Sequence, residues 1–216
     1  MMVELDPQVA AVWQTILSED AIWLMQRIVH FEMTLENAQR ILEATFTETR
    51  DRAFQTIVKN RTVHGGILAS GSGFLKHGEA GKGVLSRWYA GTLAKQIQQI
   101  QLFKRRIKFI QGDAFQAMRD YQDRETAMFF IDPPYSVAKT KSAGSRLYTF
   151  WQLDHDDLFA ACDRLKGQFC LTYDNAPEVL ALAAKYGFQS QTIAMKNTHH
   201  AEMNELVISR DMSWLF

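Results

Sequence analysis

Short apolar segments alternate with helical segments along the second half of the chain, and this alternation restricts the fold more than any other feature. The apolar runs lie at 107–111, 127–132, 168–173, 190–195 and 205–209, with helical patterns at 114–121, 154–166 and 176–186 between most of them. Strands that alternate with helices predict an α/β fold with a largely parallel sheet. No helical pattern separates the last two runs, so we expect the sheet to finish in an antiparallel pair.

The first half of the chain is patterned differently. Apolar residues recur at three- and four-residue spacing through 8–57, which predicts helices. Seven glycines fall within the 22 residues of 62–83, which predicts a loop or a loop with a hairpin. A second helical pattern covers 86–106 and ends in basic residues, which suit a helix C-terminus.

Charge is balanced over the whole chain but not along it. The 24 lysine and arginine residues equal the 24 acidic residues, yet between 59 and 106 nine basic residues accompany a single acid, Glu79. A second basic cluster consists of Lys139, Lys141 and Arg146. Such patches indicate either contact with a nucleic-acid backbone or a solvated charged face.

Other features point to a cytoplasmic protein that is not embedded in a membrane. No run of 18 apolar residues occurs, and the N-terminus has no signal-peptide pattern. Cys162 and Cys170 have no metal-ligand spacing, and we expect both to be reduced thiols. His155 and the pair at 199–200 also lack metal spacing, and we expect His155 to begin a helix that Asp154 caps. GEAGKG (78–83) lacks the spacing of a phosphate-binding loop.

Three acids follow predicted strands: Glu4, Asp113 and Asp132. In open α/β sheets, ligands bind at the carboxyl ends of the strands, although any one of these acids could instead cap a helix. Asp132 is followed by Pro133, Pro134 and Tyr135. The prolines fix the backbone and remove donors, so acceptors and an aromatic face are presented together. This arrangement suits a planar group that bears an amine, such as adenine, cytosine or an amide.

The Asp-Pro-Pro-Tyr motif after an apolar strand resembles the signature of amino-methyltransferases that use S-adenosylmethionine, in particular the N6-adenine DNA methyltransferases. Further segments resemble, in colinear order, the D12 class that includes the Dam-type adenine methylases. These segments are VELDPQVAAVW (3–13), KNRTVHGG (59–66), GKGVLSRWYAGTLAKQI (81–97), IKFIQGDAF (107–115), LYTFWQLDHDDL (147–158), LTYDNAPEV (171–179) and NELVIS (204–209). The resemblance implies a Rossmann-like methyltransferase sheet with a helical insertion. It also implies a site-specific adenine-N6 methyltransferase from a restriction-modification system, a phage or an orphan gene.

The resemblance also implies roles for individual residues. The cofactor S-adenosylmethionine would bind through Glu4 at its ribose and through Asp113, Ala114 and Phe115 around its adenine, with Asp132 beside it. The catalytic group would be Asp132, Pro133, Pro134 and Tyr135. In it, Asp132 and Pro133 accept from the N6 amine of the target and Tyr135 stacks on the flipped base. Positioning of the amine and the activated methyl group would contribute most of the acceleration.

By the same resemblance, residues 1–7 and 106–216 form the catalytic domain, and 8–105 form an inserted helical domain that recognises double-stranded DNA. The residues expected to contact DNA phosphates are Arg61, Lys76, Lys82, Arg87, Lys104, Lys139 and Lys141. For Trp88 we expect packing of the insertion onto the sheet instead of contact with DNA.

The chain departs from the family in one respect, because the first strand and its Phe-x-Gly-x-Gly loop are not found before Glu4. In the family this strand lies between the strand that ends at Glu4 and the strand that ends at Asp132. We therefore expect unpaired strand edges, weak cofactor binding, and a missing N-terminal segment or a second chain as a possible partner. The alternatives are an inactive relative that still binds DNA, and an enzyme that acts on RNA or a protein amide.

Overall fold

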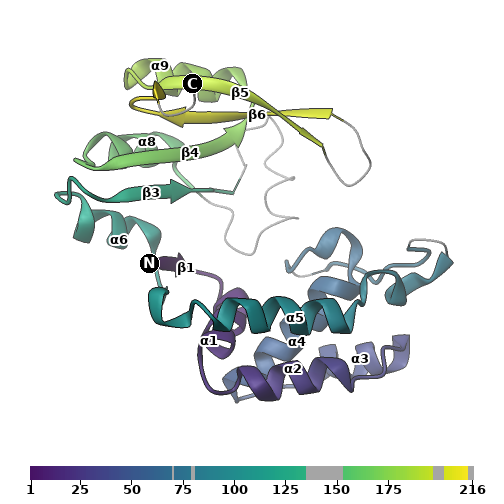
Figure 1. Ribbon diagram of the computed structural model, residues 1–216. Coiled ribbons are helices and arrows are strands. Elements are labelled where there is room, and N and C mark those ends of the chain that lie inside the picture. The colour runs from purple at the N-terminus through teal and green to yellow at the C-terminus, as the bar shows by residue number, and fades with distance from the viewer. Residues whose placement is uncertain (70, 79–80, 135–152, 197–201, 214–216) are drawn as a thin grey trace. The chain divides into compact units, whose positions relative to one another are not determined.

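The computed structural model describes residues 1–69, 71–78, 81–134, 153–196 and 202–213, and the chain divides into two compact units (Figure 1). Of the described residues, 1–113 form the first unit and 114–213 form the second. The first unit is mainly helical and the second is α/β. None of the helices in these described ranges is long and apolar enough to span a bilayer.

The first unit combines a helical bundle with a pair of short parallel strands. Its elements are β1 (Met2–Glu4), α1 (Pro7–Leu17), α2 (Ala21–Val29), α3 (Leu35–Glu43), α4 (Thr49–Thr62), the 3-10 segments η1 (His64–Gly66) and η3 (Gly83–Arg87), α5 (Ala90–Gln101), η4 (Lys104–Arg106) and β2 (Phe109–Gln111). Helix α1 begins where Asp6 accepts a hydrogen bond from the Gln8 amide at 2.8 Å, with Pro7 at the first helical position. Helix α1 packs against α4, and α2 packs against α5.

The core of this bundle is formed by apolar residues of several helices. Leu24, Ile28, Phe54 and Val58 are almost completely buried there. Trp88 packs against this core, with its ring centroid 5.7 Å from that of Phe31 in an edge-to-face arrangement. Trp88 therefore has a packing role, but its described contacts lie within the helical bundle and not, as expected, against the sheet.

The second unit is built on a four-stranded sheet. Its elements are α6 (Ala114–Tyr121), β3 (Met128–Ile131), α8 (His155–Asp163), β4 (Gln168–Asp174), α9 (Pro177–Lys185), β5 (Gln189–Lys196) and β6 (Glu202–Ser209). The strand order is β3-β4-β6-β5, with β3 and β4 parallel and the other two pairs antiparallel. The expected antiparallel pair at the end is confirmed, but this sheet is mixed rather than largely parallel. The hairpin β5–β6 pairs over eight residues, whereas β4 pairs with only four residues of β6.

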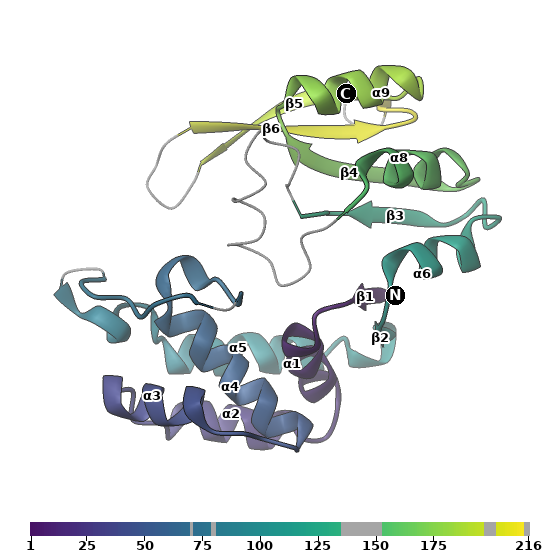
Figure 2. The ribbon, with the colours of Figure 1, turned by 180° about the vertical axis from the view of Figure 1, so that it is seen from behind.

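One face of this sheet carries the helices. Phe169, Leu171 and Tyr173 of β4 are completely buried in a core that α6, α8 and α9 complete, and Figure 2 shows α8 and α9 on the near side of the strands. Side chains alternate between the two faces of a strand. Phe130 consequently points to the opposite face and is 71% exposed, as is expected for a residue between two inward-facing neighbours.

In the part of the chain that the structure describes, β1 pairs with β2 alone and β3 pairs with β4 alone. Among the described residues, β1, β2 and β3 each have one edge without a strand partner. The strands β1 and β2 belong to the helical unit, so the boundary between the units falls after Asp113. The predicted catalytic domain, 1–7 with 106–216, thus draws on both units.

Candidate functional site

The candidate site in the second unit is centred on Asp132, which directly follows β3. Strand β3 pairs in parallel with β4 up to Ile131, opposite Leu171. Pro133 lacks a backbone N–H, so it has no donor with which to extend the ladder. The Asp132 side chain is exposed and Pro133 is buried. The sequence therefore ends a strand and presents a carboxylate at its carboxyl end, where ligands of α/β sheets bind.

A side chain of the neighbouring strand holds this carboxylate. Thr172 follows Leu171 on β4 and therefore lies beside Asp132 in the parallel register. The Thr172 hydroxyl donates to Oδ1 of Asp132 at 2.7 Å, a short distance that is typical of a hydrogen bond to a charged acceptor. The backbone pairing of β3 with β4 ends at Ile131 and Leu171, and this side-chain hydrogen bond links the next residue of each segment.

Two further acids lie on the same face of the sheet. Asp174 is two residues beyond Thr172 on β4, and Glu205 of β6 lies directly opposite Asp174. Burial raises the pKa of the Asp174 carboxyl, because a partly desolvated carboxylate favours its neutral form. The carboxyl end of the sheet therefore offers several carboxyl groups as acceptors to a ligand.

The opposite face of β4 carries a partly buried polar pair, Tyr173 and His155. The Tyr173 hydroxyl and Nδ1 of His155 are 2.6 Å apart. Burial lowers the pKa of His155, while Asp154 opposes that shift. Helix α8 begins at His155, and Asp154 caps it by accepting from the Asp157 amide at 3.1 Å. The predicted role of this histidine at a helix start is confirmed, and the pair anchors the carboxyl end of β4 to α8.

The first unit holds two of the predicted cofactor residues. Glu4 ends β1, and Asp113 lies two residues after the end of β2. These strands are parallel, with Glu4 paired with Gln111, so both acids lie at the same end of this two-stranded sheet. Oε1 of Glu4 accepts from the Asp6 amide at 2.8 Å. Carboxylates at the ends of adjacent parallel strands are chemically suited to the hydroxyl groups and amine of a nucleoside.

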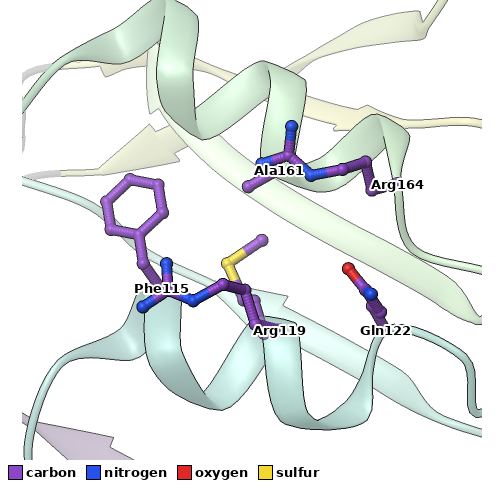
Figure 3. A pocket seen from close by; sticks show the side chains of 6 residues that line it. Phe115, Arg119, Gln122, Ala161 and Arg164 are labelled. Carbon is purple, nitrogen blue, oxygen red and sulfur yellow. The ribbon is translucent and has the colours of Figure 1, made fainter.

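The other predicted cofactor residues, Ala114 and Phe115, begin α6 in the second unit. Phe115 is partly buried against the core and lines a pocket between α6 and α8 (Figure 3). The pocket is lined by Phe115, Met118, Arg119, Gln122, Ala161 and Arg164 and has a volume of about 200 Å³. This volume includes space open to solvent, and the enclosed part has room for about one water molecule. Two guanidinium groups also line it, so it is unsuited to a sulfonium cation.

Two of the predicted DNA-binding residues lie together in the first unit. Arg61 of α4 and Arg87 of η3 are both half-buried. Burial, and then the positive charge of Arg87, lowers the pKa of Arg61. Nη1 of Arg87 lies 3.5 Å from the Val63 carbonyl. A Cβ added at Gly66, which has a φ of 71°, would lie 3.1 Å from Nη2 of Arg87, so the guanidinium rests against this glycine turn.

Arg61 and Arg87 thus bring two positive charges close to each other, and both side chains are partly buried. Among the residues that the structure describes, no carboxylate forms an ion pair with either arginine. A bound anion would offset both the repulsion and the desolvation. The pair is consequently a candidate contact for a phosphate group.

The remaining predicted residues differ in their surroundings. Lys76 and Lys82 are exposed. The Lys104 ammonium instead forms an ion pair with Glu19 at 2.8 Å, so its charge is already partly matched. Tyr135, Lys139 and Lys141 lie outside the described residues.

Sequence reasoning missed Thr172, Asp174 and Glu205. The signal for the first two was present, because the alternation of apolar residues in 168–173 places Thr172 and Asp174 on one face of a strand. The pairing of Asp174 with Glu205 depends on strand register, which this pattern does not specify.

Neither a protein-family model nor a curated protein matches the chain. The function of the chain is therefore inferred from the sequence resemblance and from the arrangement of these residues.

Proposed function

We propose that this protein is an S-adenosylmethionine-dependent DNA methyltransferase that modifies the N6 amine of adenine. The observation that carries this proposal is the exposed Asp132 carboxylate at the end of a parallel strand. It is held by Thr172 at 2.7 Å and followed at once by two prolines. The sequence resemblance assigns this motif to amino-methyltransferases, and the structure has the carboxylate in a position that suits an amine ligand.

Methyl transfer to an amine requires the protein mainly to position the amine and the methyl group. The Asp132 carboxylate and the Pro133 carbonyl would each accept an N–H of the target amine, which localises the nitrogen lone pair. S-adenosylmethionine, when bound, supplies a methyl group activated by a sulfonium. In that case the methyl carbon would bond to the amine nitrogen, the electron pair of the C–S bond would remain with sulfur, and the nitrogen would lose one proton to Asp132 or to solvent. Holding the two groups in line contributes most of the acceleration.

Of the residues that the resemblance implies for the cofactor, Glu4 and Asp113 lie in the first unit and Ala114 and Phe115 lie in the second. Both acids end strands in a way that suits a nucleoside, as described above. The Arg61–Arg87 pair would contact the DNA backbone, which must be gripped because extrusion of a base costs a few kcal/mol.

The test is methyl transfer to DNA by the full chain. Purified protein is incubated with genomic DNA and S-adenosylmethionine, and the digested nucleosides are separated by mass spectrometry. We expect N6-methyladenine, with a rate reduced by about 100-fold or more in Asp132→Ala, because an acceptor at the reacting centre is lost. Asp163→Ala, an exposed acid at the end of α8, is the control and should keep the rate. N4-methylcytosine as the sole product would contradict the adenine assignment.

A second candidate is a relative that binds DNA without turnover. The edges of β1 and β3 favour it, because neither has a second strand partner among the described residues, whereas the resemblance implies a further strand with the glycine-rich cofactor loop. Calorimetric titration of S-adenosylmethionine into the full chain decides between the two, with Asp113→Ala as the control. Binding that the substitution abolishes supports the enzyme. DNA binding without cofactor binding supports the second candidate.

A further inference from the structure

Thr172 is the described residue whose contact with Asp132 is the most direct. Its hydroxyl lies 2.7 Å from Oδ1 of Asp132 and 3.5 Å from the carbonyl oxygen of Ile131. The shorter contact has the distance of a good hydrogen bond, and the longer one is marginal. Thr172 thus donates chiefly to the carboxylate and not to the backbone.

The position of Thr172 is itself well determined. Its neighbours on β4, Leu171 and Tyr173, are completely buried and point to the helical face. Val207 of β6 lies directly opposite Thr172 and is 4% exposed. Threonine is branched at Cβ, so few χ1 rotamers are open to it on a strand. A rigid donor consequently meets the exposed carboxylate of Asp132.

We propose that Thr172 is a positioning residue for Asp132, an inference that rests on the function proposed above. By donating to Oδ1, Thr172 fixes the orientation in which the carboxylate of Asp132 accepts from the amine of the target. The hydroxyl does not touch the reacting atoms, and its effect passes entirely through Asp132. The methyl group of Thr172 has no part in this role, so serine should replace threonine and valine should not.

The rate of methyl transfer tests this role in the full chain. We expect Thr172→Val to lower kcat by about 10- to 100-fold, the range that a displacement of roughly 1 Å produces, with little change in the KM for DNA. Thr172→Ser should stay within about threefold of the wild type, because it keeps the donor. Thr192→Val, at an exposed threonine of the edge strand β5, is the matched control and should have no effect. Equal kcat in Thr172→Val and the wild type overturns the proposal.

Binding of adenosine, followed by NMR titration, gives a second readout that needs no cofactor and no turnover. The expected result is several-fold weaker binding in Thr172→Val and restored binding in Thr172→Ser. A wild type that binds adenosine in this pattern but methylates nothing overturns the proposed function and leaves the positioning role supported. Adenosine binding that is absent from the wild type, or is unchanged in Thr172→Val, overturns the positioning role. Urea unfolding of each variant confirms that the valine protein is folded.

Discussion

Gly167 lies where two backbone segments meet at the start of β4. A Cβ at this position would lie 2.3 Å from the Ala127 carbonyl oxygen and 2.8 Å from that of Arg124. The Ala127 carbonyl also accepts from the Gln168 amide at 2.9 Å, next to the first pair of the β3–β4 ladder. A side chain here must therefore displace backbone atoms that already have partners.

Gly167→Ala should destabilise the second unit by about 1–3 kcal/mol, the usual cost of overpacking. Gly91→Ala is the matched control, since Gly91 lies within α5 and has open space around it. That substitution should stabilise the protein by roughly 0.5–1 kcal/mol, because alanine favours the helix. Urea denaturation measures both changes, and equal effects of the two substitutions would show that space at Gly167 is not limiting.

Asp174 makes stability depend on pH in a definite direction. Burial raises its pKa, so the folded protein retains this proton at pH values where the unfolded chain has lost it. From about pH 4, the ordinary value for aspartate, stability therefore falls with rising pH until the raised pKa is passed. Asp174→Asn cannot ionise and should lose less free energy of unfolding than the wild type over this window. Urea unfolding at several pH values checks this, with Glu125→Gln as an exposed control. A parallel dependence in wild type and Asp174→Asn would contradict the argument.

At the scale of elements, the end of α4 and the segment η3 combine into one basic surface through Arg61 and Arg87. If one phosphate binds there, replacing either arginine by glutamine should weaken binding to all duplex sequences alike. The plot of log K against log salt concentration has a negative slope, and the magnitude of this slope should decrease by about one. Arg40→Gln, an exposed arginine of α3 that bonds Asn37, should leave the slope unchanged. Fluorescence anisotropy over a salt series measures these slopes, and slopes that do not differ would exclude a phosphate contact by the pair.

Most helices and strands were predictable from the sequence, because their apolar residues recur at the spacing typical of a helix or a strand. The pattern at 114–121 coincides with α6, and 176–186 is close to α9, where Pro177 occupies the first helical turn. Sheet organisation was less predictable. The order β3-β4-β6-β5 and the separate pair β1–β2 depend on contacts between residues far apart in the chain, and no local pattern encodes them. The acid of the candidate site was found from the Asp-Pro-Pro motif. Its partner Thr172 was not, since that contact requires the register of two strands 40 residues apart.

At the scale of the whole molecule, the edge of β3 that has no strand partner among the described residues has consequences for association. Phe130 is 71% exposed and Met128 is 58% exposed on this edge strand, and apolar edges with unpaired backbone groups attract further strands. Phe130→Lys should therefore reduce concentration-dependent self-association in sedimentation velocity. Leu180→Lys, at an exposed position of α9, is the control and should leave association unchanged. Association that Phe130→Lys does not alter would show that this edge is not the contact.

Part of the β5–β6 hairpin extends beyond its pairing with the rest of the sheet. Strand β4 pairs with β6 from Glu205 to Ile208. Among the described strands, the pairs Ala194–Asn204, Met195–Met203 and Lys196–Glu202 belong to β5 and β6 alone. A two-stranded ribbon is marginally stable without a third strand. Bending should therefore concentrate where the pairing with β4 ends, at the pair of Glu205 with Ile193. Glu205 pairs with Asp174, so this bending point lies on the same face and at the same end of the sheet as Asp132 and Thr172. A force on the extended part of the hairpin would therefore displace the carboxylates of the candidate site first.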